Sequence, residues 1–236
     1  MAPLQGVREL YINCSANLEQ GFTTLPSEGP SARLKEPART TKFSGPNLTA
    51  TGMKGLASLK GLQKLHLGFT RVTEAGLKEL APLQELQELS LYGSVTDADL
   101  KEVASLKGLQ KLHIDGLCVT NAGLKELTPL RELQELSIED SRNVTDAGLK
   151  ELARLKALRS LSVCGERVRV TDAGLKELAS LKGLRFLGLS GTSVTDAGLK
   201  ALRTQHPNCR AFTSDGYLFL CYGHYWGPRE ERHDSP

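Results

Sequence analysis

This chain has no long hydrophobic run and no large excess of one charge. No stretch approaches the 18 apolar residues of a membrane-spanning helix, and the N-terminus lacks a basic start followed by an apolar segment. The net charge is only +3, from 30 basic and 27 acidic residues, which argues against general electrostatic binding to nucleic acid or membrane. We therefore expect a cytoplasmic protein, or a fragment whose signal was removed, that binds neither.

Cysteines are few, and the common catalytic motifs are missing. The five cysteines are an odd number scattered along the chain, as expected in a reducing compartment. There is no glycine-rich phosphate loop, no Gly-x-Ser-x-Gly elbow and no His-Glu-x-x-His helix. The sequence therefore predicts no catalytic site and no cofactor.

The chain is instead rich in one repeated segment. Each copy follows a Leu-x-x-Leu-x-Leu unit, whose alternation is typical of a short strand with one buried face. The segment itself has helical spacing, with a threonine where an N-cap belongs and, in most copies, an acidic residue suited to the positive end of the helix dipole. Val-Thr-Asp-Ala-Gly-Leu-Lys-Glu-Leu, or a close variant, begins every 23 to 26 residues, at Val72, Val95, Val119, Val144, Val170 and Val194.

Both halves of this unit resemble leucine-rich repeat proteins, in the form found in bacterial arrays. The resemblance runs from about Phe43 to Leu202. It implies an α/β leucine-rich repeat solenoid, a right-handed horseshoe with parallel strands on the concave face and short helices on the convex face. Because no single unit can bury its leucines alone, successive strands must stack side by side. In the family that the chain resembles, protein partners usually bind the concave face.

The weaker ends of the pattern predict a single solenoid domain over 1–212. Units of lower similarity align at Ile12 and Phe43, with an exposed loop near 26–37 between them and a last short strand at Cys209–Phe212, giving about eight repeats. Half of the aromatic residues lie between Phe212 and Trp226. This predicts an aromatic C-terminal cap at 213–226, or a docking site for a partner, followed by a loose polar tail at 227–236.

Outward-facing residues on successive strands should form three lanes across the concave face. The first lane alternates in charge, so neighbouring strands can pair. The second is rich in histidine and serine, and the third is more varied. Either partner binding or plain solvation explains this variation. The first lane runs on to Glu135. The candidate partner-binding residues are Lys64, Glu88 and Lys111 in the first lane, His66 and His113 in the second, and Tyr92, Asp115 and Glu139 in the third.

Two strand-to-helix turns are longer than the others and rich in arginine. They should place Arg142, Arg167 and Arg169 along one rim of the solenoid. Arginine forks suit carboxylate and phosphate groups. We hypothesise that this rim contacts an acidic protein surface, with solvated arginines in a tolerated insertion as the alternative.

One group of residues has the spacing of metal ligands. His206-x-x-Cys209 and Cys221-x-x-His224 supply two histidines and two cysteines, which could form a tetrahedral zinc shell. Cys209, however, falls where the last strand needs an inward apolar residue. We therefore predict no metal site from this pattern.

These observations favour a non-catalytic scaffold or adaptor that presents a curved repeat surface to a protein partner. An effector or substrate-recognition adaptor is a second binding interpretation. A third interpretation, of a different class, is a structural protein that self-associates end to end through the exposed edge of its first unit.

Overall fold

The computed structural model describes residues 7–13, 40–44, 50–68, 72–165 and 168–213. The strands in these residues are β1 Glu9–Asn13, β2 Thr40–Ser44, β3 Lys64–Gly68, β4 Glu88–Leu91, β5 Lys111–Asp115, β6 Glu135–Glu139, β7 Ser160–Val163, β8 Phe186–Gly188 and β9 Arg210–Phe212. The helices are α1 Ala50–Leu56, α2 Glu74–Lys78, α3 Asp97–Val103, α4 Asn121–Glu126, α5 Asp146–Leu152, α6 Asp172–Glu177, the 3-10 helix η1 Leu178–Ser180, and α7 Asp196–Gln205.

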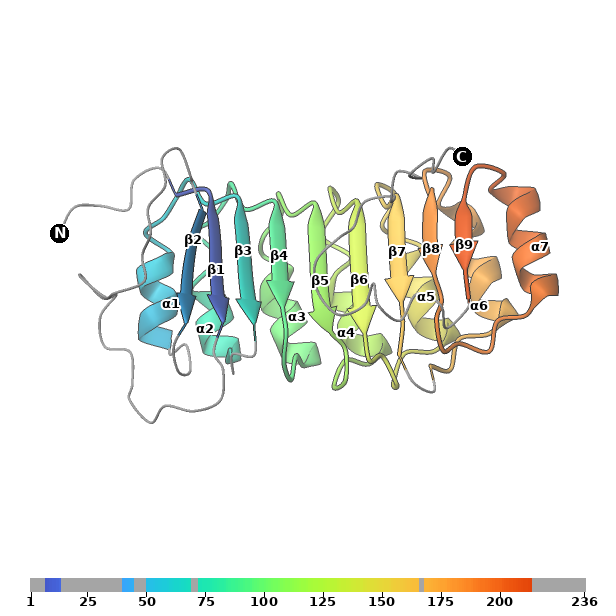
Figure 1. Ribbon diagram of the computed structural model, residues 1–236, viewed down its shortest axis with the longest axis horizontal. Helices are drawn as coiled ribbons and strands as arrows, with labels where there is room; N and C mark the ends of the chain where they lie inside the picture. The colour runs from blue at the N-terminus through green and yellow to red at the C-terminus, as the bar shows by residue number, and fades with distance from the viewer. Residues whose placement is uncertain (1–6, 14–39, 45–49, 69–71, 166–167, 214–236) are drawn as a thin grey trace, which may run out of the picture.

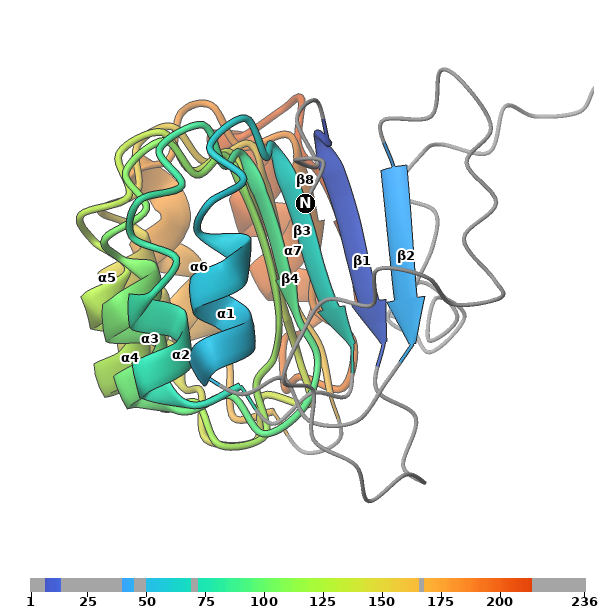
Figure 2. The same ribbon diagram turned by 90° about the vertical axis from the view of Figure 1, so that its left-hand side faces the viewer.

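The strands lie in one open parallel sheet, and the helices form a layer on one side of it (Figures 1 and 2). From β3 to β8 each strand is followed by a helix, and the helices of neighbouring repeats pack against one another. We call the other side of the sheet, on which none of the described helices lies, the helix-free face. The predicted last strand is confirmed, because β9 begins one residue after Cys209.

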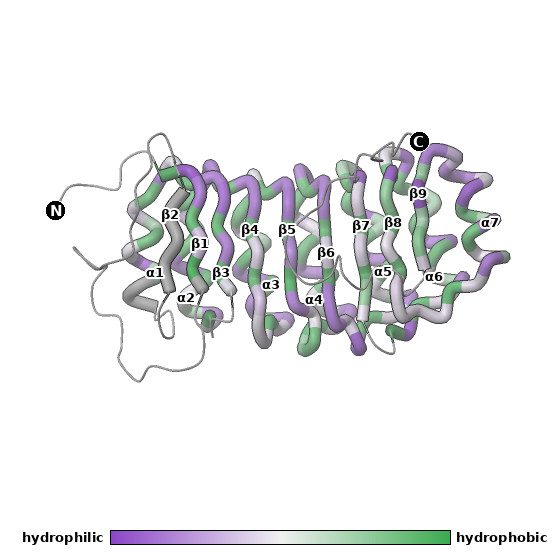
Figure 3. The backbone as a smooth tube through the Cα atoms, viewed as in Figure 1, coloured by the Kyte–Doolittle hydropathy of each residue, from purple (hydrophilic) through white to green (hydrophobic). Residues whose placement is uncertain are grey.

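The core is a ladder of leucines that point from the sheet toward the helix layer. One inward residue of each strand from β3 to β8 is a leucine in register with its neighbours. Hydrophilic and hydrophobic segments recur from repeat to repeat along the chain (Figure 3). The leucines of this ladder, each at most 2% exposed, are Leu65, Leu89, Leu112, Leu136, Leu161 and Leu187.

The order of the first two strands differs from the order in the sequence. The sheet order is β2-β1-β3, so β1 lies between β2 and β3, while α1 packs directly on α2. The expectation that units stack strictly in chain order is therefore wrong at this end. Leu10 of β1 is 1% exposed and is opposite Leu65 on one side and Thr41 on the other. The more apolar strand thus lies next to the core, where its burial is most favourable.

Side chains at the helix starts tie each repeat to the next. The carboxylate of Asp97 accepts hydrogen bonds from the backbone N of Thr120 at 2.8 Å and from its Oγ1 at 2.6 Å. The same pair of bonds joins Asp146 to Thr171, and Asp172 to Thr195. The acidic residues predicted to complement the helix dipole therefore also form clamps between repeats.

The glycine of the repeated segment leaves room for this clamp. A Cβ on Gly148 would lie 2.6 Å from Oδ1 of Asn121, the residue that takes the place of the aspartate in that repeat. A Cβ on Gly123, Gly174 or Gly198 would meet the clamping aspartate of the preceding repeat even more closely. Glycine is required here by the neighbouring side chain and not by the backbone conformation.

One repeat has an aspartate at the position of this glycine, and the aspartate of the preceding repeat is absent there. Where the preceding helix starts with Glu74 instead of aspartate, the glycine position is occupied by Asp99. The carboxylate of Asp99 receives hydrogen bonds from the backbone N of Thr96 at 2.9 Å and from its Oγ1 at 2.8 Å, closing a capping box within its own helix. The threonines that obtain a carboxylate or amide oxygen from one of these two sources are Thr96, Thr120, Thr145, Thr171 and Thr195.

The predicted loop near 26–37 and tail at 227–236 lie outside the described residues, as does the predicted cap beyond Thr213.

Candidate partner-binding face of the sheet

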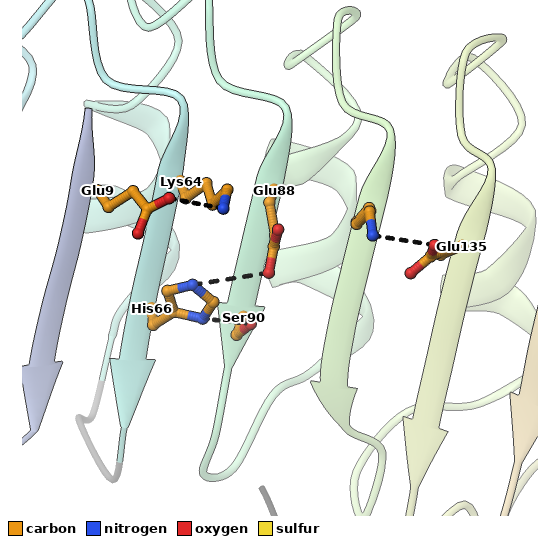
Figure 4. A network of polar contacts seen from close by, with 7 residues as sticks. Glu9, Lys64, His66, Glu88, Ser90 and Glu135 are labelled. Carbon is orange, nitrogen blue, oxygen red and sulfur yellow. Dashed lines mark hydrogen bonds and ion pairs between the residues drawn. The ribbon is translucent and has the colours of Figure 1, made fainter. Parts of the chain in front are cut away.

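The first lane of the helix-free face carries alternating charges on β1 and on β3 to β6, and two ion pairs form within it. Nζ of Lys64 lies 2.6 Å from Oε1 of Glu9, and Nζ of Lys111 lies 2.9 Å from Oε1 of Glu135 (Figure 4). The hydrogen bond that Lys64 donates to the Glu9 carboxylate raises the pKa of Lys64. The alternation of charge was predicted from the sequence, but Glu9 was missed, because β1 was expected beyond β2 and not beside β3. Partly exposed pairs of this kind contribute about 0–1 kcal/mol each.

The second lane holds His66 in a fixed position. Its ring stacks on Tyr11 with the centroids 4.2 Å apart and the planes at 6°. Its Nδ1 hydrogen-bonds with Oγ of Ser90 at 2.8 Å, and its Nε2 lies 3.6 Å from Oε1 of Glu88 (Figure 4). Glu88 therefore contacts the histidine, whereas the lysines on either side of it pair with other carboxylates.

His113 lies two strands from His66, as the sequence predicted, with Ser90 between them in register. It is half-buried. Burial lowers the pKa of His113, and the charges of Glu88 and Glu135 oppose this only in part. The imidazole is therefore neutral at pH 7 and offers one donor and one acceptor.

The third lane brings together Tyr92, Asp115 and Glu139, all half-buried. Asp115 lies directly opposite Glu139 in the register of β5 and β6. Burial raises the pKa of Glu139 to about 8, assisted by Cys164 and by the charges of Asp115 and Asp140. The three candidates are thus gathered in one place, as the alternation of the strands predicted.

The pKa values of the other two residues of this lane, Asp115 and Tyr92, are also raised. Burial raises the pKa of Asp115, although hydrogen bonds from backbone groups of Leu117 and Gly93 oppose the rise. Burial and the charge of Glu139 raise the pKa of Tyr92. Among the described residues, no Lys, Arg or His forms an ion pair with Asp115, Glu139 or Asp140.

Tight turns after the strands place these carboxylates. Gly116 follows Asp115, and its N–H donates to the carbonyl O of Glu139 at 2.5 Å. A Cβ on Gly116 would lie 2.5 Å from Cγ2 of Ile138, so the close approach of the two turns requires glycine. Asp140 has a φ of 50°, a conformation that aspartate tolerates better than most residues. Asp140 was not among the predicted site residues. The feature of the sequence that could have indicated it is its place directly after Glu139.

The known proteins that this chain is similar to are solved structures with a similar fold. No protein-family model and no curated protein sequence matches the chain. The solved structure of internalin inlF from Listeria monocytogenes aligns at 18% identity over 74% of this chain and 53% of that chain, with a TM-score of 0.46. Internalin C2 of the same organism aligns at 23% identity over 70% of this chain and 75% of that chain, with a TM-score of 0.50. Internalins are leucine-rich repeat proteins. The fold is a leucine-rich repeat solenoid.

The predicted rim of the leucine-rich repeat solenoid is described in part. Arg142 and Arg169 are both exposed, and Arg169 forms a parallel bridge with Thr145 of the preceding turn. Arg167 lies outside the described residues. The backbone N of Arg142 donates to the carbonyl O of Asp140 at 2.8 Å, and this arginine lies three residues beyond Glu139 of the third lane.

The residues with metal-like spacing are also described in part. His206 and Cys209 are 3% and 6% exposed, whereas Cys221 and His224 lie outside the described residues. Burial raises the pKa of Cys209 to about 11, and burial together with Lys182 lowers the pKa of His206. Within the described part of the chain, no three His, Cys, Asp or Glu side chains gather as a metal site would need.

None of the described helices of the leucine-rich repeat solenoid is long and apolar enough to cross a membrane.

Proposed function

We propose that this chain is a non-catalytic protein-binding module whose binding surface is centred on the third lane, Tyr92, Asp115 and Glu139. The contrast between two lanes of the same face carries the proposal. In the first lane, Lys64 and Lys111 neutralise carboxylates within the described residues. In the third lane, the carboxylates crowd together and no cation of the described residues pairs with them, and their pKa values rise.

This arrangement favours a partner that supplies a lysine or arginine side chain. A desolvated carboxylate with a raised pKa gains the most from an incoming positive charge, because the new pair replaces an unfavourable environment. Tyr92 stands beside the carboxylates, and a tyrosine offers both apolar contact area and a hydroxyl group, as residues that dominate interfaces often do. The proposed partner is therefore a protein segment with a basic residue.

The remaining candidates have supporting roles in this proposal. Lys64, Glu88, Lys111 and His66 pair within the described residues and stiffen the surface beside the third lane. Arg142 and Arg169 flank it on the turn side, where they could contact acidic groups of the same partner.

A displayed library of random peptides tests the proposal. Peptides selected on the wild-type chain should be enriched in lysine or arginine and should bind at least tenfold more weakly to the double variant Asp115→Asn, Glu139→Gln. Both changes keep the shape of the side chain and replace a carboxyl group, which can ionise and pair with a cation, by an amide that cannot. Binding is measured by fluorescence anisotropy with each selected peptide.

The matched control is Glu126→Gln, Glu177→Gln, which also replaces two carboxyl groups by amides, at exposed positions on α4 and α6. It should leave the affinity of these peptides within about twofold. Selected peptides without basic residues, or equal losses in both double variants, would count against the third lane as the binding surface.

Self-association is a second candidate, favoured by one observation. In the described sheet β2 pairs on one side only, with β1, so an edge of backbone donors and acceptors faces outward. The sequence suggested that the first strand of the chain forms this edge. In the described sheet the edge strand is β2. Light scattering over a hundredfold dilution should show a falling mean mass; a monomer at every concentration removes this candidate.

A further inference from the structure

A change of residue type occurs at one equivalent position in the last repeats. The residue just before the first lane is Gln63, Gln87, Gln110 and Gln134 in four repeats, and Arg159 and Arg185 in the next two. Backbone hydrogen bonds confirm that these positions are equivalent. Each residue donates its N–H to the carbonyl O of its predecessor, including Arg159 to Gln134 at 2.8 Å and Arg185 to Arg159 at 2.7 Å.

The first lane loses its acidic residues at the same point. Ser160 stands opposite Glu135, Phe186 opposite Ser160, and Arg210 opposite Phe186. The alternating carboxylates that neutralise the lysines of β3 and β5 are thus absent from β7, β8 and β9 in this lane. The amino-terminal ends of these strands, together with the turns before them, carry five exposed cations: Lys156, Arg159, Lys182, Arg185 and Arg210. We call this group the basic edge.

The charges of the basic edge are not neutralised within the described residues. Glu151 pairs with Arg154 at 3.4 Å, and no ion pair of a described carboxylate reaches any of the five cations. Nζ of Lys156 donates instead to the carbonyl O of Ala153 and to Oγ of Ser180. Like charges opposite each other on neighbouring strands are unfavourable, so Arg159 and Arg185 are expected to favour an external anion.

We propose that the basic edge is a second docking surface, which binds an acidic segment of a protein partner. Neighbouring strands are about 4.8 Å apart, and side chains three or four residues apart on a helix are about 5–6 Å apart. Carboxylates on one face of an acidic helix can therefore meet the arginines of successive strands. Arginine forks bind carboxylates with two parallel hydrogen bonds.

The size of the basic edge favours a protein segment over nucleic acid. Its arginines span three strands, roughly 10 Å, which covers only a few charges of a polynucleotide backbone, and the net charge of the whole chain is only +3. Nucleic-acid binders usually contact many phosphates along an extended basic surface. A short acidic segment matches the surface more closely.

A labelled helical peptide with glutamate at every fourth position provides the test. The double variant Arg159→Gln, Arg185→Gln introduces the residue that four other repeats carry at this position, so the fold is expected to tolerate it. Fluorescence anisotropy at low salt should show binding to the wild type that weakens at least tenfold in the double variant and weakens with added salt.

The control variant is Lys150→Gln, Lys176→Gln, which removes two exposed charges from α5 and α6 and should keep the peptide affinity within about twofold. Asp115→Asn, Glu139→Gln should not weaken it, which separates this surface from the third lane. The proposal is overturned if the peptide does not bind the wild type, or if the arginine double variant and the lysine double variant lose the same affinity for it. It is also overturned if an oligonucleotide of equal charge binds more tightly than the peptide.

Discussion

Asp146→Ala is expected to lower the free energy of unfolding by roughly 2–3 kcal/mol. The aspartate accepts two hydrogen bonds from Thr171, one from the backbone N at 2.8 Å and one from Oγ1 at 2.7 Å. Both donors belong to the next repeat, so the variant loses a link between repeats and leaves partly buried donors without their acceptor. Urea denaturation followed by circular dichroism measures the change.

Gly174→Ala tests the same clamp from the other side. A Cβ on Gly174 would collide with the Asp146 carboxylate, so the variant should lose roughly 1–3 kcal/mol by displacing the clamp, although alanine is the better helix former by about 1 kcal/mol. In the Asp146→Ala background the collision with the carboxylate is gone, while contacts of 3.0 Å with Cδ1 of Leu149 and 3.2 Å with Cα of residue 146 remain. The same substitution should then cost less than it does when Asp146 is present, and a double-mutant cycle measures this difference.

The control for this cycle is Gly55→Ala in α1. A Cβ there would meet nothing within 4 Å, so the substitution should stabilise the protein by roughly 0.5–1 kcal/mol in either background. If Gly174→Ala has the same effect on stability with and without the Asp146 carboxylate, the clamp does not limit the residue at this position.

The periodicity of the sequence predicted the solenoid because each unit carries its own local signals. Leu65 and its equivalents marked the buried face of every strand, and the threonines marked the helix starts. The side chains of Thr73, Thr171 and Thr195 accept hydrogen bonds from their own helices. At Thr145 no such bond is present; its Oγ1 accepts from Nδ2 of Asn121 in the preceding repeat, a contact that depends on the stacking.

Contacts between distant segments could not be predicted in the same way. The pairing of Lys64 with Glu9 depends on the insertion of β1 between β2 and β3, and no local pattern near Glu9 specifies a neighbour 55 positions away. The alternation of the strands predicted that Asp115 and Glu139 lie in one lane, but it did not predict that Asp140 lies beside them. The raised pKa of Glu139 was not predicted either, because it depends on the burial that the folded turns produce.

Glu139→Gln is expected to stabilise the protein at alkaline pH. The pKa of Glu139 is raised from 4.5 to about 8 in the folded state, so between these values the folded chain holds a proton that the unfolded chain releases. The stability of the wild type therefore falls as the pH rises through this window. Glutamine cannot ionise, and since Glu139 is partly exposed and screened by water, we expect the variant to gain roughly 2 kcal/mol at pH 9.

At pH 4 the wild-type side chain is protonated in the folded state and mostly protonated in the unfolded state, and the difference between wild type and Glu139→Gln should be below about 0.5 kcal/mol. Denaturation in urea at both pH values measures the two differences, and Glu126→Gln on the exposed surface of α4 is the control, with less than about 0.5 kcal/mol at either pH. A stabilisation that is the same at pH 4 and pH 9 would mean that ionisation of Glu139 is not the cause. A gain confined to alkaline pH would show that the free protein keeps a carboxylate at the expense of its own stability, as expected of a residue retained for binding a cationic partner.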